Sequence, residues 1–115
     1  MSVRRDTRDV ILRYWKSWQK QDWDELRDCL ADEVRMGEHA VSADAFTQMC
    51  RLGPPWRDVE LLHSVFTDGH GSLLYEGTDT RTGRRIRVGE FIDLEDGRVA
   101  RSVACFGGGD LPQEK

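Results

Sequence analysis

The hydrophobic residues of this chain change their spacing near its middle. In the first half they recur three and four positions apart, as Val10, Ile11, Tyr14, Trp15 and Trp18 do. That spacing places apolar side chains in one stripe along a helix. In the second half apolar and polar residues alternate, which is typical of strands with one buried face. Helices followed by a run of strands predict an α+β domain, with helices covering one face of a curved sheet.

Three helices are predicted in the first half. Asp6 or Thr7 can cap the helix that carries the apolar stripe. Asp22 has the capping-box spacing to a later glutamate, and we expect the helix it opens to include Leu30. Ser42 can cap a third helix, which ends where a glycine precedes two prolines.

Five strands are predicted, most of them in the second half. Glycine-containing turns separate the last four of them. The expected strands cover residues 34–38, 56–66, 72–80, 85–94 and 99–106. The whole arrangement fits one domain over residues 1–106, followed by a flexible tail at 107–115.

Composition and charge argue against two classes of partner. The net charge is -4, whereas nucleic-acid binding is favoured by a basic face. The one basic cluster is interpreted as a solvated hairpin tip, and it contains Arg81, Arg84, Arg85 and Arg87. No apolar run approaches the roughly 20 residues of a membrane-spanning helix, so we expect no membrane partner.

The cysteines and histidines predict neither a disulfide framework nor a metal site. Cys29, Cys50 and Cys105 are odd in number and far apart. Reduced thiols in a cytoplasmic protein fit that pattern best. The three histidines lack metal-ligand spacing, and the orientation of His63 is left open by the sequence.

Two predicted strands each carry one carboxylate in an otherwise apolar row. Alternation places Glu38 on the same face as Val34 and Met36. It places Glu90 in a row with four branched aliphatic residues: Ile86, Val88, Ile92 and Leu94. Apolar surroundings disfavour the charged form of a carboxyl group, so one such group can stay neutral and donate while another acts as a base.

Tyr14 adds a third polar group, because it lies on the apolar stripe of the first helix. Its hydroxyl could donate to an oxyanion that develops during a reaction. Structural interpretations stay open beside the catalytic one. Glu38 can reach solvent near a strand end, Glu90 can pair with Arg87 or Arg101 or lie at a subunit interface, and Tyr14 can satisfy its hydroxyl on a carbonyl.

Further residues are predicted to line a pocket between helices and sheet. Their aromatic, sulfur-containing or small side chains lie on the faces that the alternation turns inward. Two tryptophans are expected at the floor and Phe46 and Met49 at the mouth. The predicted lining consists of Trp15, Trp18, Phe46, Met49, Ser102, Ala104 and Phe106.

Several segments resemble the nuclear-transport-factor-2-like superfamily, and especially its steroid isomerase and polyketide cyclase (SnoaL-like) branch. They are residues 10–14, Asp22-Trp23-Asp24, residues 30–33, and the final hairpin with Asp96-Gly97-Arg98-Val99. The resemblance implies a cone-shaped barrel: a curved, mostly antiparallel sheet wrapped around a pocket by three helices. That superfamily hosts isomerases, cyclases, epoxide hydrolases and binding domains, so the resemblance specifies fold better than activity.

The ketosteroid isomerase pattern maps onto three residues. Its oxyanion-hole tyrosine matches Tyr14, its catalytic base matches Glu38, and its protonated acid matches Glu90 when the strand is counted from the Asp96-Gly97 turn. Counting from the preceding turn would place Gly89 at the acid position. This chain also departs from the family, because both acids are glutamates and His39 replaces a proline.

Three functions follow as hypotheses. The first is cofactor-free proton transfer on a small apolar carbonyl compound, in which Glu38 removes the proton while Tyr14 and Glu90 stabilise the enolate. The second is non-catalytic binding of a small apolar molecule. The third is association as a homodimer, which the resemblance implies for the outer sheet face carrying Arg87, Phe91, Arg101, Val103 and Cys105.

Overall fold

The computed structural model describes residues 6–53 and 55–108, in which three helices pack against a mixed sheet and two of the strands come before the third helix. The helices are α1 (Thr7–Lys20), α2 (Trp23–Asp28) and α3 (Ala43–Leu52). The strands in the described residues are β1 (Leu30–Met36), β2 (His39–Ser42), β3 (Trp56–Thr67), β4 (His70–Asp79), β5 (Arg85–Glu95) and β6 (Arg98–Gly108). The predicted α+β class is confirmed by this order.

Each helix begins at a polar cap that the sequence indicates. The side chains of Asp6, Asp22 and Ser42 accept hydrogen bonds from backbone N–H groups of the first turn, at 3.4, 3.2 and 3.0 Å. Such caps satisfy N–H groups that have no partner within the helix. They therefore fix where each helix begins.

The second helix is shorter than predicted, because the chain turns into a strand at Leu30. Helix α2 ends at Asp28, and Leu30 is fully buried in β1 opposite Val99. The backbone carbonyl of Cys29 accepts a 2.8 Å hydrogen bond from the N–H of Val99. Pairing with β6 thus draws Leu30 into the sheet and buries it there.

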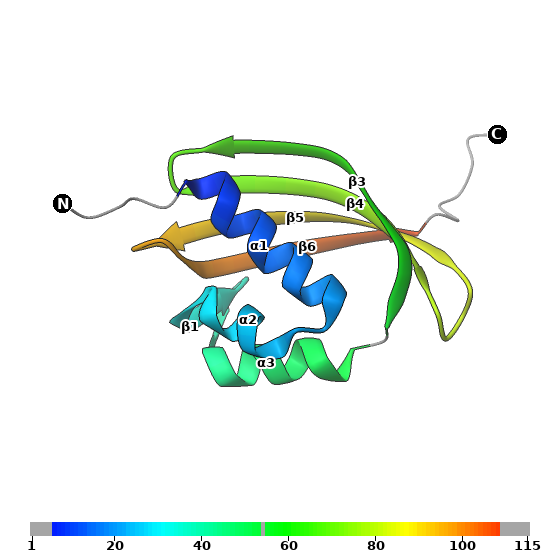
Figure 1. Cartoon of the computed structure of the whole chain (residues 1–115), viewed down its shortest axis with the longest axis horizontal. Coiled ribbons are helices and arrows are strands. Elements are labelled where there is room, and N and C mark those ends of the chain that lie inside the picture. Colours follow the sequence, from blue (N-terminus) through cyan, green and yellow to red (C-terminus); the bar gives the residue numbers. More distant parts are fainter. Residues whose placement is uncertain (1–5, 54, 109–115) are drawn as a thin grey trace.

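The six strands of the described region form one sheet in the order β2-β1-β6-β5-β4-β3. Strands β1 and β6 pair in parallel, and the other neighbours are antiparallel. Strands β2 and β3 are the two edges, so hydrogen bonds do not close the sheet into the expected barrel. The sheet is instead open and curved, as Figure 1 shows for its long strands.

The four later strands begin and end within two residues of the predicted bounds. Their turns use left-handed backbone, as at Asp96 and Gly97 with φ of 51° and 75°. Strand β6 extends to Gly108, so the glycines expected to open a tail belong partly to the sheet. The rest of the predicted tail, 109–115, lies outside the described residues.

The core lies between the helices and the inner face of the sheet. Helix α1 crosses the long strands, while α2 and α3 lie beside β1 (Figure 1). Ile11, Leu26, Leu30, Val34 and Val99 are completely buried in this layer. No helix in the described part of the chain is long and apolar enough to cross a membrane.

Candidate functional site: an aromatic pocket around Glu90

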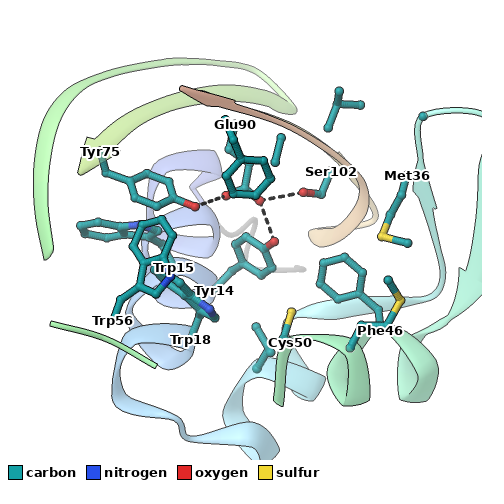
Figure 2. A pocket seen from close by; sticks show the side chains of 16 residues that line it. Tyr14, Trp15, Trp18, Met36, Phe46, Cys50, Trp56, Tyr75, Glu90 and Ser102 are labelled. Atoms are coloured by element: carbon teal, nitrogen blue, oxygen red, sulfur yellow. Dashed lines mark hydrogen bonds between the residues drawn. The ribbon is translucent and has the colours of Figure 1, made fainter. Parts of the chain in front are cut away.

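A pocket of about 530 Å³ opens between the helices and the inner face of the sheet. That volume is in the range of small-molecule sites. Most of the side chains that line it are aromatic or aliphatic (Figure 2). The lining residues are Tyr14, Trp15, Trp18, Leu26, Met36, Gly37, Phe46, Met49, Cys50, Trp56, Tyr75, Glu90, Ser102, Val103, Ala104 and Phe106.

Glu90 is the one carboxylate among the described residues that line the pocket, and it is only 5% exposed. Three hydroxyl groups donate to it (Figure 2). Tyr14 Oη and Ser102 Oγ each lie 2.7 Å from Glu90 Oε2, and Tyr75 Oη lies 3.0 Å from Glu90 Oε1. A carboxylate offers about four acceptor positions, so this arrangement leaves about one unfilled.

The sheet register brings these groups together. Glu90 pairs with Ala104, and Ser102 lies two residues along β6 on the same face. Tyr75 reaches Glu90 diagonally from β4, because its direct partner is Val88. Same-face neighbours on adjacent strands are within reach of long side chains in this geometry. Helix α1 then supplies Tyr14 from the opposite wall.

Burial and the nearby Glu90 together raise the pKa of three side chains that line the pocket. Burial, and next the proximity of Glu90, raise the pKa of Tyr14 well above its ordinary value. The same two causes raise the pKa of Tyr75. Burial, followed by the charge of Glu90, raises the pKa of the Cys50 thiol to about 12. Both tyrosines and Cys50 are therefore neutral near pH 7, and the tyrosines keep the protons that they donate.

Four aromatic rings form a connected group on one side of Glu90. The Tyr75 ring centroid lies 5.4 Å from that of Trp15, 5.7 Å from Trp18 and 6.3 Å from Trp56. The Trp18 and Trp56 rings are 5.4 Å apart. Tyr75 belongs both to this group and to the hydrogen-bond network of Glu90. Figure 2 shows Phe46, Met36 and Cys50 on the other side of the pocket.

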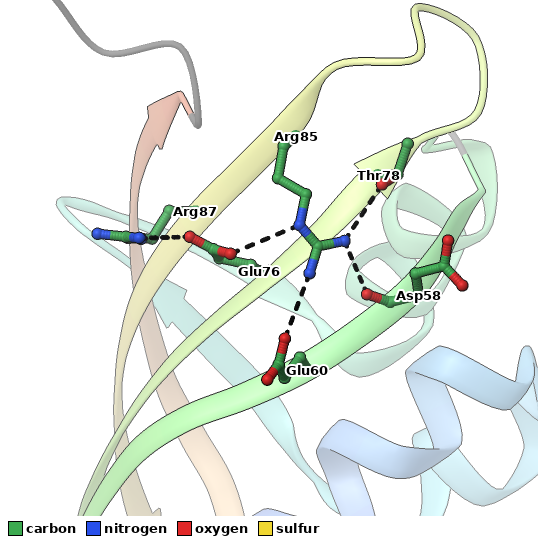
Figure 3. Close-up of polar contacts among 6 residues, drawn as sticks. All are labelled: Asp58, Glu60, Glu76, Thr78, Arg85 and Arg87. Carbon is green, nitrogen blue, oxygen red and sulfur yellow. Dashed lines mark hydrogen bonds and ion pairs between the residues drawn. The ribbon is translucent and has the colours of Figure 1, made fainter. Parts of the chain in front are cut away.

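An irregularity in β3 positions Trp56 in the pocket wall. The register of β3 against β4 shifts between Arg57 and Glu60, and Asp58 has a φ of 53°. Arg85 Nη1 donates to the backbone carbonyl of Asp58 at 2.8 Å (Figure 3). Trp56, just before the shift, packs over Gly77 of β4. The arginine therefore holds the bulge beside a pocket residue.

The predicted basic cluster is ion-paired on the outer side of the sheet. Arg85 and Arg87 both contact Glu76, at 3.5 and 2.5 Å, and Arg85 also reaches Glu60 at 3.6 Å (Figure 3). Arg81 lies 3.9 Å from Asp79. Pairing with nearby acids means that these arginines do not form an isolated basic patch.

The structure contradicts the expected direction of Glu38. Strand β1 ends at Met36, and Gly37, with a φ of 63°, begins a turn that places Glu38 in solvent. Glu38 does not line the pocket, whereas Met36 and Gly37 do. The alternation that links Val34 to Met36 stops at the turn, so extending it by two residues was wrong.

The other predicted site residues all lie at the pocket. Tyr14, Glu90 and all seven residues of the predicted lining contact it. Phe106 is 71% exposed and Met49 51%, so both belong to the mouth. Phe46 is buried more deeply, at 6% exposed. The catalytic roles suggested for Tyr14 and Glu90 stay predictions.

Two important pocket residues, Tyr75 and Trp56, were not predicted from the sequence. Alternation alone places Tyr75 on the face of Leu73, but the register that brings it to Glu90 requires knowledge of the loop before β5. Trp56 depends on the bulge, which leaves no periodic signal. Ser102 was predicted only as a lining residue, yet its hydroxyl donates to Glu90.

The alternative partners suggested for Glu90 bind elsewhere. Arg87 pairs with Glu76, and Arg101 lies 3.8 Å from Asp93. Gly89, the residue given by the other counting of the strand, pairs with Cys105 in the outward-facing row. His63 is exposed opposite Leu74, which places it on the outer face too.

Comparisons with known proteins establish the fold. No protein-family model matches the sequence, and a search of curated proteins gave no significant match. A structure of a putative ketosteroid isomerase from Kribbella flavida superposes with a TM-score of 0.82 at 16% identity, covering 95% of this chain and 83% of that chain. An NTF-2 like protein of unknown function from Burkholderia xenovorans superposes with a TM-score of 0.76 at 14% identity. The superposition covers 95% of this chain and 86% of that chain.

A third similar structure is a putative polyketide cyclase from Silicibacter, with a TM-score of 0.68 at 20% identity and 88% coverage of both chains. Other similar structures include NTF2-like proteins of unknown function. The chain therefore has the nuclear-transport-factor-2-like fold that its sequence resembles. Identities this low show the fold alone, and the function must be argued from the site.

Proposed function

We propose that this chain binds a small, mostly apolar molecule in the pocket, with a polar group of that molecule at Glu90. The observation that carries the proposal is the buried carboxylate in the wall of an otherwise apolar cavity. Apolar walls supply most of the binding free energy in such sites, and a few polar groups fix orientation. Exposed Met49 and Phe106 at the mouth give an entering molecule apolar surface to contact.

A thermal-shift screen with steroid-like and polyketide-like compounds tests this proposal. A ligand that binds only the folded state raises the melting temperature in a concentration-dependent way. Ala104→Phe is expected to fill the pocket and abolish the shift. Ala40→Phe is the matched control, because Ala40 is exposed on β2 away from the pocket lining. Equal shifts in both variants, or no shift with any compound, would contradict pocket binding.

A second candidate is cofactor-free proton transfer on a small apolar carbonyl compound. It is favoured by the 2.7 Å hydrogen bond between Tyr14 and Glu90 in the pocket wall. With Glu38 in solvent, Glu90 would remove the proton from the carbon beside the carbonyl group. Once Glu90 holds that proton it accepts fewer hydrogen bonds, and Tyr14 and Tyr75, which now donate to it, could then donate to the charged substrate oxygen.

Isomerisation of a model enone tests the catalytic candidate. Glu90→Gln is expected to lower kcat/KM by about 100-fold or more, because it removes the base. Glu38→Gln makes the same chemical change in solvent and is expected to leave the rate unchanged. Absence of turnover by the wild type, or equal loss in the two variants, would leave binding as the function.

A further inference from the structure

The pocket contains a carboxyl group that pairs with no cation among the described residues. Glu90 is buried and accepts only from hydroxyl groups. The arginines nearest in the strand pattern, Arg87 and Arg101, pair with Glu76 and Asp93 instead. Burying a carboxylate is unfavourable unless hydrogen bonds or an opposite charge compensate it. Here three hydroxyl groups provide the compensation, and a cationic ligand would add the opposite charge that the protein does not place there.

The hydrogen-bonding groups of the pocket favour a ligand that donates hydrogen bonds. The hydroxyls of Tyr14, Tyr75 and Ser102 already donate to Glu90, whose remaining acceptor position is unfilled. The indole N–H of Trp15 lacks a partner among the described residues, but it is covered by its neighbours. A ligand N–H therefore finds an acceptor, whereas a ligand carbonyl finds no donor without rearrangement.

The aromatic group is placed to contact a cation at Glu90. Tyr75 donates to Glu90 and lies against Trp15, Trp18 and Trp56. Aromatic faces attract organic cations, and the attraction strengthens when the site excludes water. Figure 2 shows these rings gathered beside the carboxylate. A cation that binds Glu90 is consequently next to aromatic surface.

No positively charged side chain among the described lining residues would repel a cation at Glu90. Lysine, arginine and histidine are missing from the described residues that line the pocket. Cys50, with a pKa of about 12, is an uncharged thiol at neutral pH. The pocket thus combines one carboxylate with aromatic and aliphatic walls, which complements a single positive charge on an apolar body.

We propose that the ligand is an organic ammonium ion, a protonated primary or secondary amine on an apolar body. Its N–H group donates to Glu90, its positive charge lies beside Tyr75 and the tryptophans, and its carbon skeleton fills the cavity toward Phe46. This inference rests on the proposed function, because it names the chemical class of the molecule that the pocket binds.

Three compounds with one skeleton test the proposal by calorimetry at pH 7: cyclohexylmethylamine, cyclohexylmethanol and cyclohexanecarboxylate. The amine is expected to bind about tenfold or more tightly than the alcohol, because it adds a charge-assisted hydrogen bond and contact with aromatic faces. The carboxylate is expected to bind most weakly, since its charge repels Glu90.

Variants locate the origin of the preference. Glu90→Gln keeps the shape of the side chain and should remove the advantage of the amine over the alcohol. Glu95→Gln is the matched control on the same strand, since Glu95 is exposed and outside the pocket lining. If Glu90→Gln does not fold, Trp18→Leu serves in its place and should weaken the amine more than the alcohol.

The possible outcomes distinguish failure of the ammonium proposal from failure of pocket binding itself. If the alcohol binds at least as tightly as the amine, the ammonium proposal is overturned while pocket binding stands. An amine preference that persists in Glu90→Gln overturns it as well, because the charge then lies elsewhere. If none of the three compounds binds and the thermal-shift screen is also negative, both proposals are wrong.

Discussion

Glu90 is a buried acid that hydroxyl groups, and not arginines, surround. Its three donors come from α1, β4 and β6, so the network ties the helix to two strands of the sheet. Each net hydrogen bond to a charged group contributes about 1.5–3 kcal/mol, and leaving such a group without its donor is more costly still. The same side chains therefore serve the fold and the candidate site.

The two tyrosines of the chain provide a direct optical test of this network. Their raised pKa values predict that native protein shows no phenolate absorbance near pH 10, where exposed tyrosine ionises. A raised folded-state pKa stabilises the fold below the unfolded value, and this contribution is lost as pH rises toward the folded value. Absorbance at 295 nm during alkaline titration measures the ionisation of the two tyrosines, with denatured protein as the control. A native titration step near pH 10 would contradict burial.

Alternation predicted Glu90 and Ser102 correctly in direction, because both lie in the middle of long regular strands. The helical stripe likewise placed Tyr14 at the pocket. The predicted direction of Glu38 was wrong because the sequence does not mark where β1 ends and its turn begins. Tyr75 was missed because strand pairing decides its neighbours, and pairing register is a property of two segments together.

Among the elements, β4 carries a glycine where a side chain would collide with the aromatic wall. A Cβ at Gly77 would lie 2.5 Å from Trp56 Cε3, whereas a Cβ at Gly89 of β5 meets nothing within 4 Å. Neither glycine has a left-handed φ. The two positions thus separate the effect of crowding from that of adding a methyl group to a strand.

Gly77→Ala is expected to destabilise the fold by about 1–3 kcal/mol, since overpacking displaces neighbouring rings. Gly89→Ala is expected to change stability little. Urea denaturation of both variants measures the free energy of unfolding, and tryptophan fluorescence reports the displaced indole. Equal stability of the two variants would show that Trp56 does not pack on Gly77.

The outer-face ion pairs make part of the stability pH-dependent. Hydrogen bonding and attraction from Arg87, with a further contribution from Arg85, lower the pKa of Glu76 below its ordinary value of 4.5. A lowered folded-state pKa adds stability above the unfolded value, and that stability is lost as pH falls through the folded value. Glu76→Gln should therefore destabilise the protein at pH 7 and much less near pH 3. Urea titrations at the two pH values measure the difference, and a pH-independent effect would contradict the pairing.

Element order was predictable because local signals dictate it. Caps, helical spacing, alternation and glycine turns each act over a few residues, and they placed three helices and four long strands. Strand β1 was predicted four residues too late and β2 was not predicted, since Leu30 joins the sheet through pairing with Val99 of β6. Strands β2 and β3 stay unpaired with each other at the two edges of the sheet, and this likewise depends on curvature that no local pattern encodes.

At the scale of the whole molecule, the outer face of the sheet carries exposed apolar side chains among its ion pairs. Phe91 is 54% exposed and Val65 51%. The register places Phe91 beside Val103 and Gly89 beside Cys105, so an apolar strip runs between the Arg87–Glu76 and Arg101–Asp93 ion pairs. We propose that it pairs with the same face of a second copy, because a two-fold axis sets identical apolar strips against each other.

Phe91→Asp tests the homodimer. Wild-type protein is expected to sediment as a dimer at micromolar concentration, and the variant as a monomer, because the change buries a charge at the centre of the interface. Binding of pocket ligands should persist in the monomer, since Phe91 points away from the pocket lining. A monomeric wild type would dismiss this interface.

Nuclear magnetic resonance of the indole N–H groups tests pocket binding most directly. Of the four tryptophans, Trp15, Trp18 and Trp56 line the pocket and Trp23 does not. Adding the compound that raises the melting temperature most should shift the three pocket signals in a saturable way and leave that of Trp23 in place. Saturable shifts confined to Trp23, or unchanged pocket signals at saturating compound, would show that the molecule binds elsewhere.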